Sequence, residues 1–595
     1  MLISILQNYY NISILKNYFL LATCFLLMGC LPSSPPNPTP TPEPTPTLPP
    51  LARAVDVQES AVKVLLAIEP PSFNAYLNDS GYEALIGELV YSALAEMGHD
   101  GKYYPELAEA LPTLSNGGLS PDGKTVVWQL RKDVKWSDGT PFTSADVMFT
   151  REILNQSGIW TPGIDLIKEM VAPDEHTVII TYKQFYPNYL IQFGGLGTGI
   201  FPKHYCEDDH ETMLLWEQCN FNPISTGPFI LGEWVPGERL TFLPNPHYFV
   251  SDRPLASQLV LEIVSNPKLR QRMLERGDAQ LDLWPYEKQI IRRMERSKSG
   301  NVYLYATVPA RYLLRLVPNL SEPGHPDKPH PILGDKRVRQ AILQSIDVER
   351  LNRRAFDGKG IPMQTELNQI GCFLTPYYYD PGIAQALLNQ AGWVLQPGDE
   401  VRSCQGCGTA EDGTPLILKS YTYDEFGEPL HEAHELIGEM LARVYIKLDR
   451  EVVEGGKLWG TWNDNGIELR GNFDLNLWDD GYYGIDPTIR MGDYFDPRSI
   501  PTRDNPIAGL NVGRYYNPTL IDIFDALYTP LPTNRRRTLL CELATIIHQD
   551  LPHIPLLALP DLYGINRSLQ GVAPHIYDTV TWNAADWRVI RLPGE

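Results

Sequence analysis

The segment from residue 125 to residue 150 constrains the fold more than any other part of the chain. Residues 125–130 are rich in β-branched and aromatic side chains, as expected of a half-buried strand. Asp138-Gly139 then predicts a tight turn, because glycine accepts the positive φ that such turns need. Pro141 ends the pairing, and Thr143 is a helix N-cap with Asp146 three residues later. By local chemistry alone, the segment predicts only a strand, a turn and a helix.

Taken together, residues 130–147 say more. They are LRKDVKWSDGTPFTSADV, and this run closely resembles the signature of the family 5 extracellular solute-binding proteins, which include the oligopeptide- and dipeptide-binding components of ABC importers. A single Asp-Gly turn is common, but a matching run of about eighteen residues is specific. Shorter sequence motifs of the same family occur in the family's order over residues 60–590. Among them are YSAL at 91–94, PELAE at 105–109, FPKH at 201–204, STGPF at 225–229, DKRVRQAI at 335–342 and DLPHIPL at 550–556.

The resemblance implies an α/β fold of the two-lobed periplasmic-binding-protein type, with hinge strands and an extra subdomain in the first lobe. Carried onto this chain, residues 56–312 form lobe one with the subdomain, 313–557 form lobe two, and 558–595 return to lobe one. A chain that crosses twice between lobes is suited to hinge closure around a ligand. Apolar patterning predicts strands at 62–68 and 177–182 and helices at 82–97, 335–351 and 535–549.

The front of the chain predicts export. Lys16 supplies a basic flank, and residues 18–28 form an apolar run too short to span a bilayer comfortably. The run ends in LMGC at 27–30, which resembles a lipobox, so residues 1–30 are expected to be a signal peptide with Cys30 lipidated; an uncleaved membrane anchor is the alternative. Residues 31–55 form a Pro/Thr-rich linker, in which ten prolines over 31–50 favour extended polyproline II. Both alternatives place the remainder outside the cytoplasm, held at the membrane.

The resemblance also locates a ligand site. Peptide-binding members hold the ligand's α-amino group with an aspartate that follows a tryptophan and precedes a proline, and residues 476–487 match that region. Asp480 is the first candidate and Asp479 the second, while a purely structural turn aspartate stays open. A carboxylate in a closed cleft pairs strongly with an ammonium group and rejects a blocked one. Trp478, Tyr482 and Tyr483 are candidates for stacking on a peptide or a saccharide, because aromatic faces suit both ligands. Phe73 and Asn74 are expected to line the opposite wall of the cleft.

Six cysteines follow the signal segment, and an even number in an exported protein suggests disulfides, with fifteen possible pairings. Cys206 and Cys219 are close in sequence and form the best candidate pair. The Cys404-x-x-Cys407 motif resembles half a zinc site, but the other half is missing. His431 and His434 are three residues apart on an expected helix, where a solvated polar face is favoured over a metal site.

Neither a nucleophile elbow nor a glycine-rich phosphate loop with its lysine is present, so no enzyme activity, cofactor or metal is predicted. The net charge of −22 argues against nucleic acid and anionic membrane surfaces as partners. We therefore expect a monomeric, lipid-anchored extracytoplasmic protein, in the periplasm or on the outer face of the cytoplasmic membrane, that delivers oligopeptides to an ABC permease. Two alternatives remain: the ligand is an oligosaccharide, chelated nickel or another small solute, or the protein has a sensory role. A catalytic hydrolase is the least favoured alternative.

Overall fold

The computed structural model describes residues 61–592, apart from 78–81, 158–162, 194–197, 208, 210–212, 284–291, 293, 296–299, 308–311, 425, 482–485 and 507. These residues belong to one compact unit that spans 56–595. The expected signal peptide, Cys30 and the linker lie outside the described residues. Among the helices that are described, none has the length and apolarity needed to cross a bilayer.

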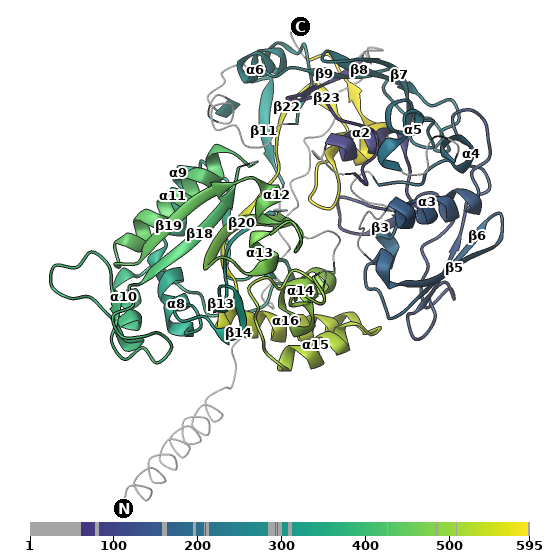
Figure 1. The fold of residues 1–595 in the computed structure, drawn as a ribbon. Coiled ribbons are helices and arrows are strands. Elements are labelled where there is room, and N and C mark those ends of the chain that lie inside the picture. The colour runs from purple at the N-terminus through teal and green to yellow at the C-terminus, as the bar shows by residue number, and fades with distance from the viewer. Residues whose placement is uncertain are drawn as a thin grey trace, which may run out of the picture. The chain divides into compact units, whose positions relative to one another are not determined.

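The first lobe is built on a seven-stranded sheet with the order β11-β22-β10-β1-β9-β8-β7. Figure 1 shows the C-terminal β22, in yellow, returning to this sheet. Its core contains buried residues from Val62 to Leu283 and again from Tyr563 to Trp587. The strands are β1 (Val62–Leu66), β7 (Phe229–Val235), β8 (Arg239–Pro244), β9 (Leu259–Ile263), β10 (Leu281–Asp282), β11 (Val302–Ala306) and β22 (Leu562–Asn566).

A separate three-stranded sheet with the order β4-β6-β5 carries the signature segment. It consists of β4 (Thr125–Gln129), β5 (Ile167–Asp174) and β6 (Thr177–Tyr182), next to helix α3 (Ser144–Ser157). The predicted strand, turn and helix are confirmed: Gly139 has φ of 92°, and the Thr143 amide donates to Asp146 Oδ2 over 2.9 Å. The other helices of the first lobe are α2 (Tyr82–Val90), α4 (Lys203–Cys206), α5 (Gln218–Phe221) and α6 (Pro267–Arg276).

The second lobe has its own core, whose buried residues run from Leu313 to Leu559. Its central sheet has the order β15-β21-β12-β20, and β18 pairs in parallel with β19 beside it. These strands are β12 (Tyr312–Pro318), β15 (Ile361–Pro362), β18 (Ile417–Tyr423), β19 (Lys447–Val453), β20 (Leu475–Gly481) and β21 (Ile554–Leu559). The helices are α8 (Lys336–Ser345), α9 (Val348–Ala355), α10 (Pro381–Gln390), α11 (Glu428–Ala442), α12 (Gly455–Leu458), α13 (Ile467–Arg470), α14 (Thr488–Phe495), α15 (Thr519–Leu527) and α16 (Thr533–Asp550).

Four short antiparallel pairs complete the strands in the described ranges. They are β2 (Ala95–Met97) with β3 (Tyr103–Pro105), β13 (Ser321–Glu322) with β14 (His325–Pro329), β16 (Trp393–Val394) with β17 (Ser403–Cys404), and β23 (Leu569–Gln570) with β24 (Arg588–Val589).

Two connections between the lobes lie side by side. β11 pairs with β22 in the first lobe, and β12 pairs with β21 in the second, so both strand pairs lead into the same crossing. Between them, the Thr307 amide donates to the Asp561 carbonyl and the Asp561 amide donates to Thr307 Oγ1, each over 3.0 Å. The two strands that cross are thus tied to each other at the hinge.

The structure corrects two expected helices. The helix expected over 82–97 ends at Val90, because the Val90 carbonyl accepts the amides of Thr226 and Gly227 and residues 95–97 pair as β2. The helix expected over 335–351 is two helices. Ile346 is extended there, and Asp347 caps α9 by accepting the Arg350 amide over 2.8 Å.

Three disulfides are present in the described part of the chain. Cys206 bonds to Cys219, joining α4 to α5 in the first lobe. In the second lobe Cys404 bonds to Cys407, and Cys372 bonds to Cys541 of α16 across a sequence separation of 169 residues. The two sulfurs of the Cys404-x-x-Cys407 motif are thus bonded to each other.

Candidate functional site

The candidate site lies at one edge of the second lobe's sheet. β18 and β19 are parallel, and β20 runs in the same direction, because the Lys419 amide donates to the Asp474 carboxylate and the Tyr421 amide to the Asn476 side chain. The carboxyl ends of all three strands therefore meet at this edge, where α/β sheets usually bind ligands. Tyr312, just after the hinge, pairs with Gly481 at the end of β20, so the edge is also next to the lobe crossing.

Asp479 and Asp480 point to opposite faces of β20, because successive side chains alternate across a strand. In the antiparallel register with β12, Asp479 is opposite Leu314 and Asp480 is opposite Leu313. The two candidate aspartates are adjacent in sequence, yet they have different partners.

Asp480 is already engaged by cationic and hydroxyl groups. Arg490 Nη2 donates to Asp480 Oδ1 over 2.7 Å, and the Tyr494 hydroxyl donates to Oδ2. Arg315 Nη2 lies 3.7 Å from the same carboxylate. The charge of Asp480 is thus balanced from within the protein.

Arg315 is the centre of a buried polar network. Its guanidinium contacts the rings of both Trp478 and Tyr494, 4.2 and 4.6 Å from their centroids, and its Nε is 3.2 Å from Glu366. Glu366 also contacts His553 Nδ1 over 2.7 Å. Burial opposes the charged form of Glu366, yet His553 and Arg315 hold the pKa of this carboxyl below its ordinary value. Through the contact of Arg315 with its ring, the network holds Trp478 in position.

Asp479 has a different environment. The Tyr423 hydroxyl donates to Asp479 Oδ1 over 2.5 Å. Burial and, to a smaller extent, the nearby Asp480 raise the pKa of Asp479 to about 6. Among the described residues, no lysine or arginine lies within ion-pair distance of it. Asp479 is therefore the carboxylate with unmet charge at this edge.

Of the other predicted site residues, Trp478 is buried, while Tyr482 and Tyr483 lie outside the described residues. Phe73 is buried against the edges of Trp234 and Phe242. The Asn74 side chain donates to Asn220 over 3.1 Å. Both Phe73 and Asn74 thus have internal partners in the first lobe.

Sequence reasoning missed the partners of the two aspartates. Arg315 could have been predicted from the sequence as one half of a buried ion pair. It is the lone charged residue in the apolar strand 312–318, and a charged side chain in such a strand is seldom buried unless it is paired. Tyr423, Trp459 and Arg490 left no such signal, because only the fold brings them next to β20.

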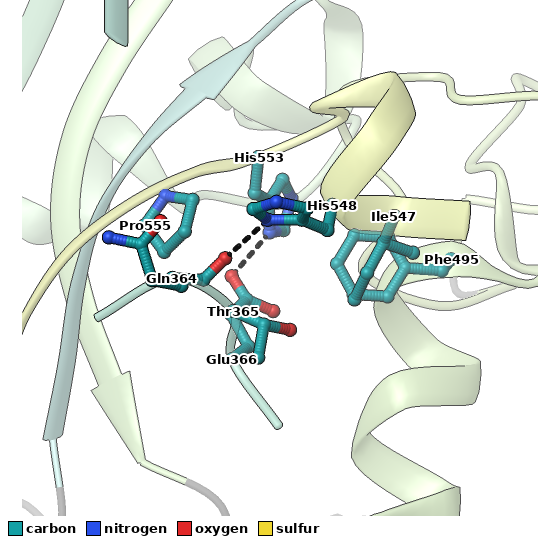
Figure 2. A pocket seen from close by; sticks show the side chains of 8 residues that line it. All are labelled: Gln364, Thr365, Glu366, Phe495, Ile547, His548, His553 and Pro555. Carbon is teal, nitrogen blue, oxygen red and sulfur yellow. Dashed lines mark hydrogen bonds and ion pairs between the residues drawn. The ribbon is translucent and has the colours of Figure 1, made fainter. Parts of the chain in front are cut away.

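A small pocket is lined by Glu366 and His553 of the same network. Figure 2 shows Glu366 facing His553 and His548 contacting Gln364 beside it. Its volume of about 10 Å³ is close to what one water molecule needs. This pocket is too small for a peptide and belongs to the support of the site.

Other predicted or possible ligand groups lie away from this edge. His434 is buried and hydrogen-bonded to Ser420 Oγ over 2.7 Å, so the expected solvated histidine face is wrong for this residue. In the first lobe, carboxylate oxygens of Glu88, Glu96 and Asp578 lie within 4.8 Å of one another. Burial and the neighbouring Asp578 raise the pKa of Glu96, which favours a shared proton in that cluster.

Comparison with known proteins agrees with this fold. The model of the bacterial extracellular solute-binding proteins, family 5, matches residues 102–502. Protein XP55 of Streptomyces lividans is 27% identical over 79% of this chain and 78% of its own length. AppA of Bacillus subtilis, solved with a nonapeptide, superposes with a TM-score of 0.67 at 20% identity, over 89% of this chain and 99% of its own. NikZ of Campylobacter jejuni, solved with Ni(L-His), has the same TM-score at 21% identity, over 89% and 100%. These structures share the two-lobed periplasmic-binding-protein fold with this chain.

Proposed function

Since the chain belongs to the family 5 bacterial extracellular solute-binding proteins, we propose that it captures oligopeptides by closure of its two lobes and delivers them to an ABC permease. The lobes would be residues 56–312 with 558–595, and residues 313–557. The hinge pair of Thr307 and Asp561 would bend while the two sheets stay rigid. A ligand that contacts both lobes stabilises the closed state only through those contacts.

The observation that carries the peptide proposal is the uncompensated Asp479 carboxylate at the carboxyl edge of β20. The positively charged amino group of a free peptide N-terminus would neutralise the Asp479 carboxylate. Asp480 remains the alternative anchor, but Arg490 and Arg315 already balance its charge. We therefore assign the amine to Asp479 and give Asp480 the role of holding Arg490 and Tyr494 in place.

The first test identifies the ligand. Small molecules released by denaturing the purified protein would be measured by mass spectrometry, with unfolded and refolded protein as control. Released short peptides support the proposal. Released oligosaccharides or a metal chelate would overturn the peptide assignment and leave the fold and family unchanged.

The second test separates the two aspartates. Asp479→Asn and Asp480→Asn have nearly the same size as the native residues, and their affinities for one peptide with a free or an acetylated N-terminus would be compared. We expect Asp479→Asn to erase the preference for the free amine, because a charge-assisted hydrogen bond is lost. If only Asp480→Asn erases it, the assignment reverts to Asp480.

We also propose that Cys30 is lipidated and that the protein acts as a monomer at the membrane. Incorporation of a labelled fatty acid into the wild type but not into Cys30→Ser supports the anchor. A label that persists in Cys30→Ser excludes it. Cross-linking to the permease, against cross-linking to a sensor protein, decides between transport and sensing.

A further inference from the structure

Trp459 stands out beside the candidate site. Among the tryptophans in the described ranges it alone is more than a third exposed, at 42%. It follows α12 and packs on the Tyr423 ring with centroids 4.6 Å apart, and it meets Trp478 edge to face at 6.1 Å. Tyr423 in turn donates its hydroxyl to Asp479. An exposed aromatic ring is thus coupled to the proposed amine anchor through one side chain.

The segments that carry this ring and Tyr423 contain acidic residues. Asp424 follows Tyr423 directly, and Glu454 precedes α12, at whose other end Trp459 lies. The nearby Lys457 is 3.3 Å from Glu451, which balances it. Asp424 has only His431 as its described ion-pair partner, at 3.3 Å. The face of an indole ring attracts cations, and the acidic residues of these segments favour a cationic ligand over an anionic one.

We propose that Trp459, Tyr423 and Asp479 form a subsite that selects ligands carrying a cationic side chain next to the free amino group. This inference rests on the proposed peptide capture. The ammonium or guanidinium group of the first or second residue lies over the exposed face of Trp459, while Asp479 holds the terminal amine. Arg315 supports the subsite from behind by fixing the ring of Trp478.

The test compares Lys-Ala-Ala with norleucine-Ala-Ala, which has a similar chain length without the charge. Wild-type protein is expected to bind the lysine peptide about 2- to 5-fold more tightly, as cation–π contacts of this exposure give. Trp459→Leu should remove this ratio and Trp459→Phe should keep part of it. Trp462→Leu is the matched control, since Trp462 lies in the same loop and its carbonyl accepts from Arg470. A ratio of one in the wild type, or a ratio unchanged in Trp459→Leu, overturns the proposal.

Failure of peptide capture itself gives a different result. If neither tripeptide binds, the released ligands decide the proposed function, and the subsite is tested separately with N-acetyl-lysine amide and N-acetyl-norleucine amide. Indole NMR signals would be followed in the wild type and in Trp459→Leu. A shift caused only by the lysine compound and lost in the variant supports the cation subsite. Equal shifts from both compounds, or no shift, refute it.

Discussion

The Cys372–Cys541 disulfide allows a quantitative prediction about the second lobe. It closes a loop with a sequence separation of 169 residues, whereas Cys404–Cys407 closes one with a separation of three. In the chain-entropy model, a cross-link stabilises a protein by restricting its unfolded chain, and the effect grows with the logarithm of loop length. The long loop gives about 5 kcal/mol and the short loop about 2 kcal/mol, a difference of about 3 kcal/mol.

The experiment compares Cys372→Ser/Cys541→Ser with Cys404→Ala/Cys407→Ala by calorimetry and urea unfolding. At about 2 °C per kcal/mol for a lobe of this size, the first pair should lower the transition of the second lobe by about 10 °C and the second pair by about 4 °C. Cys404 and Cys407 are buried, so loss of their packing adds to the second value and narrows the gap.

The first lobe is an internal control, because its own disulfide, Cys206–Cys219, is untouched and its transition should not move. Equal losses from the two double variants would refute the chain-entropy reasoning. They would show that local packing around the sulfurs, and not the length of the closed loop, sets the contribution of each disulfide.

Three further predictions follow from single side chains. A Cβ on Gly466 would lie 1.7 Å from the Gly460 carbonyl oxygen, whereas one on Gly456 meets nothing within 4 Å. Gly466→Ala should therefore lower the free energy of unfolding by about 3 kcal/mol, and Gly456→Ala should not, as urea midpoints will show. Burial, with Arg450 and His431, lowers the pKa of His434 from 6.5 to about 3. Between these values only the unfolded chain binds this proton, so stability falls as pH falls, by about 1.4 kcal/mol per pH unit, and His434→Gln should reduce that slope in urea titrations at pH 4 to 7. Because burial raises the pKa of Asp479 to about 6, beside Tyr423, Asp480 and Arg315, affinity for a free-amine ligand should fall about tenfold from pH 7 to pH 5; a flat profile would contradict the assignment.

Much of the local structure followed from the sequence, because it depends on residues close together in the chain. The strand, turn and helix of the signature segment rest on Gly139, Thr143 and Asp146, all within a few residues of one another. The N-cap of α8 at Asp335 is of the same kind, with its carboxylate accepting the Arg337 amide over 2.8 Å. The two-lobed fold came from the resemblance to a family, which the structural comparison supports.

The tertiary structure decided what depends on distant partners. Val90 ends its helix because Thr226 and Gly227 take its carbonyl, and no local signal announces that contact. The same applies to the two aspartates, which the sequence places side by side. Alternation along β20 turns Asp480 toward Arg490 and Arg315 and turns Asp479 toward Tyr423, from a strand more than fifty residues earlier. The sequence determined that two aspartates could carry negative charge at the site. The fold determined that Asp480 is paired within the protein and that the Asp479 carboxylate is left for a ligand, because burial and pairing depend on neighbours in space.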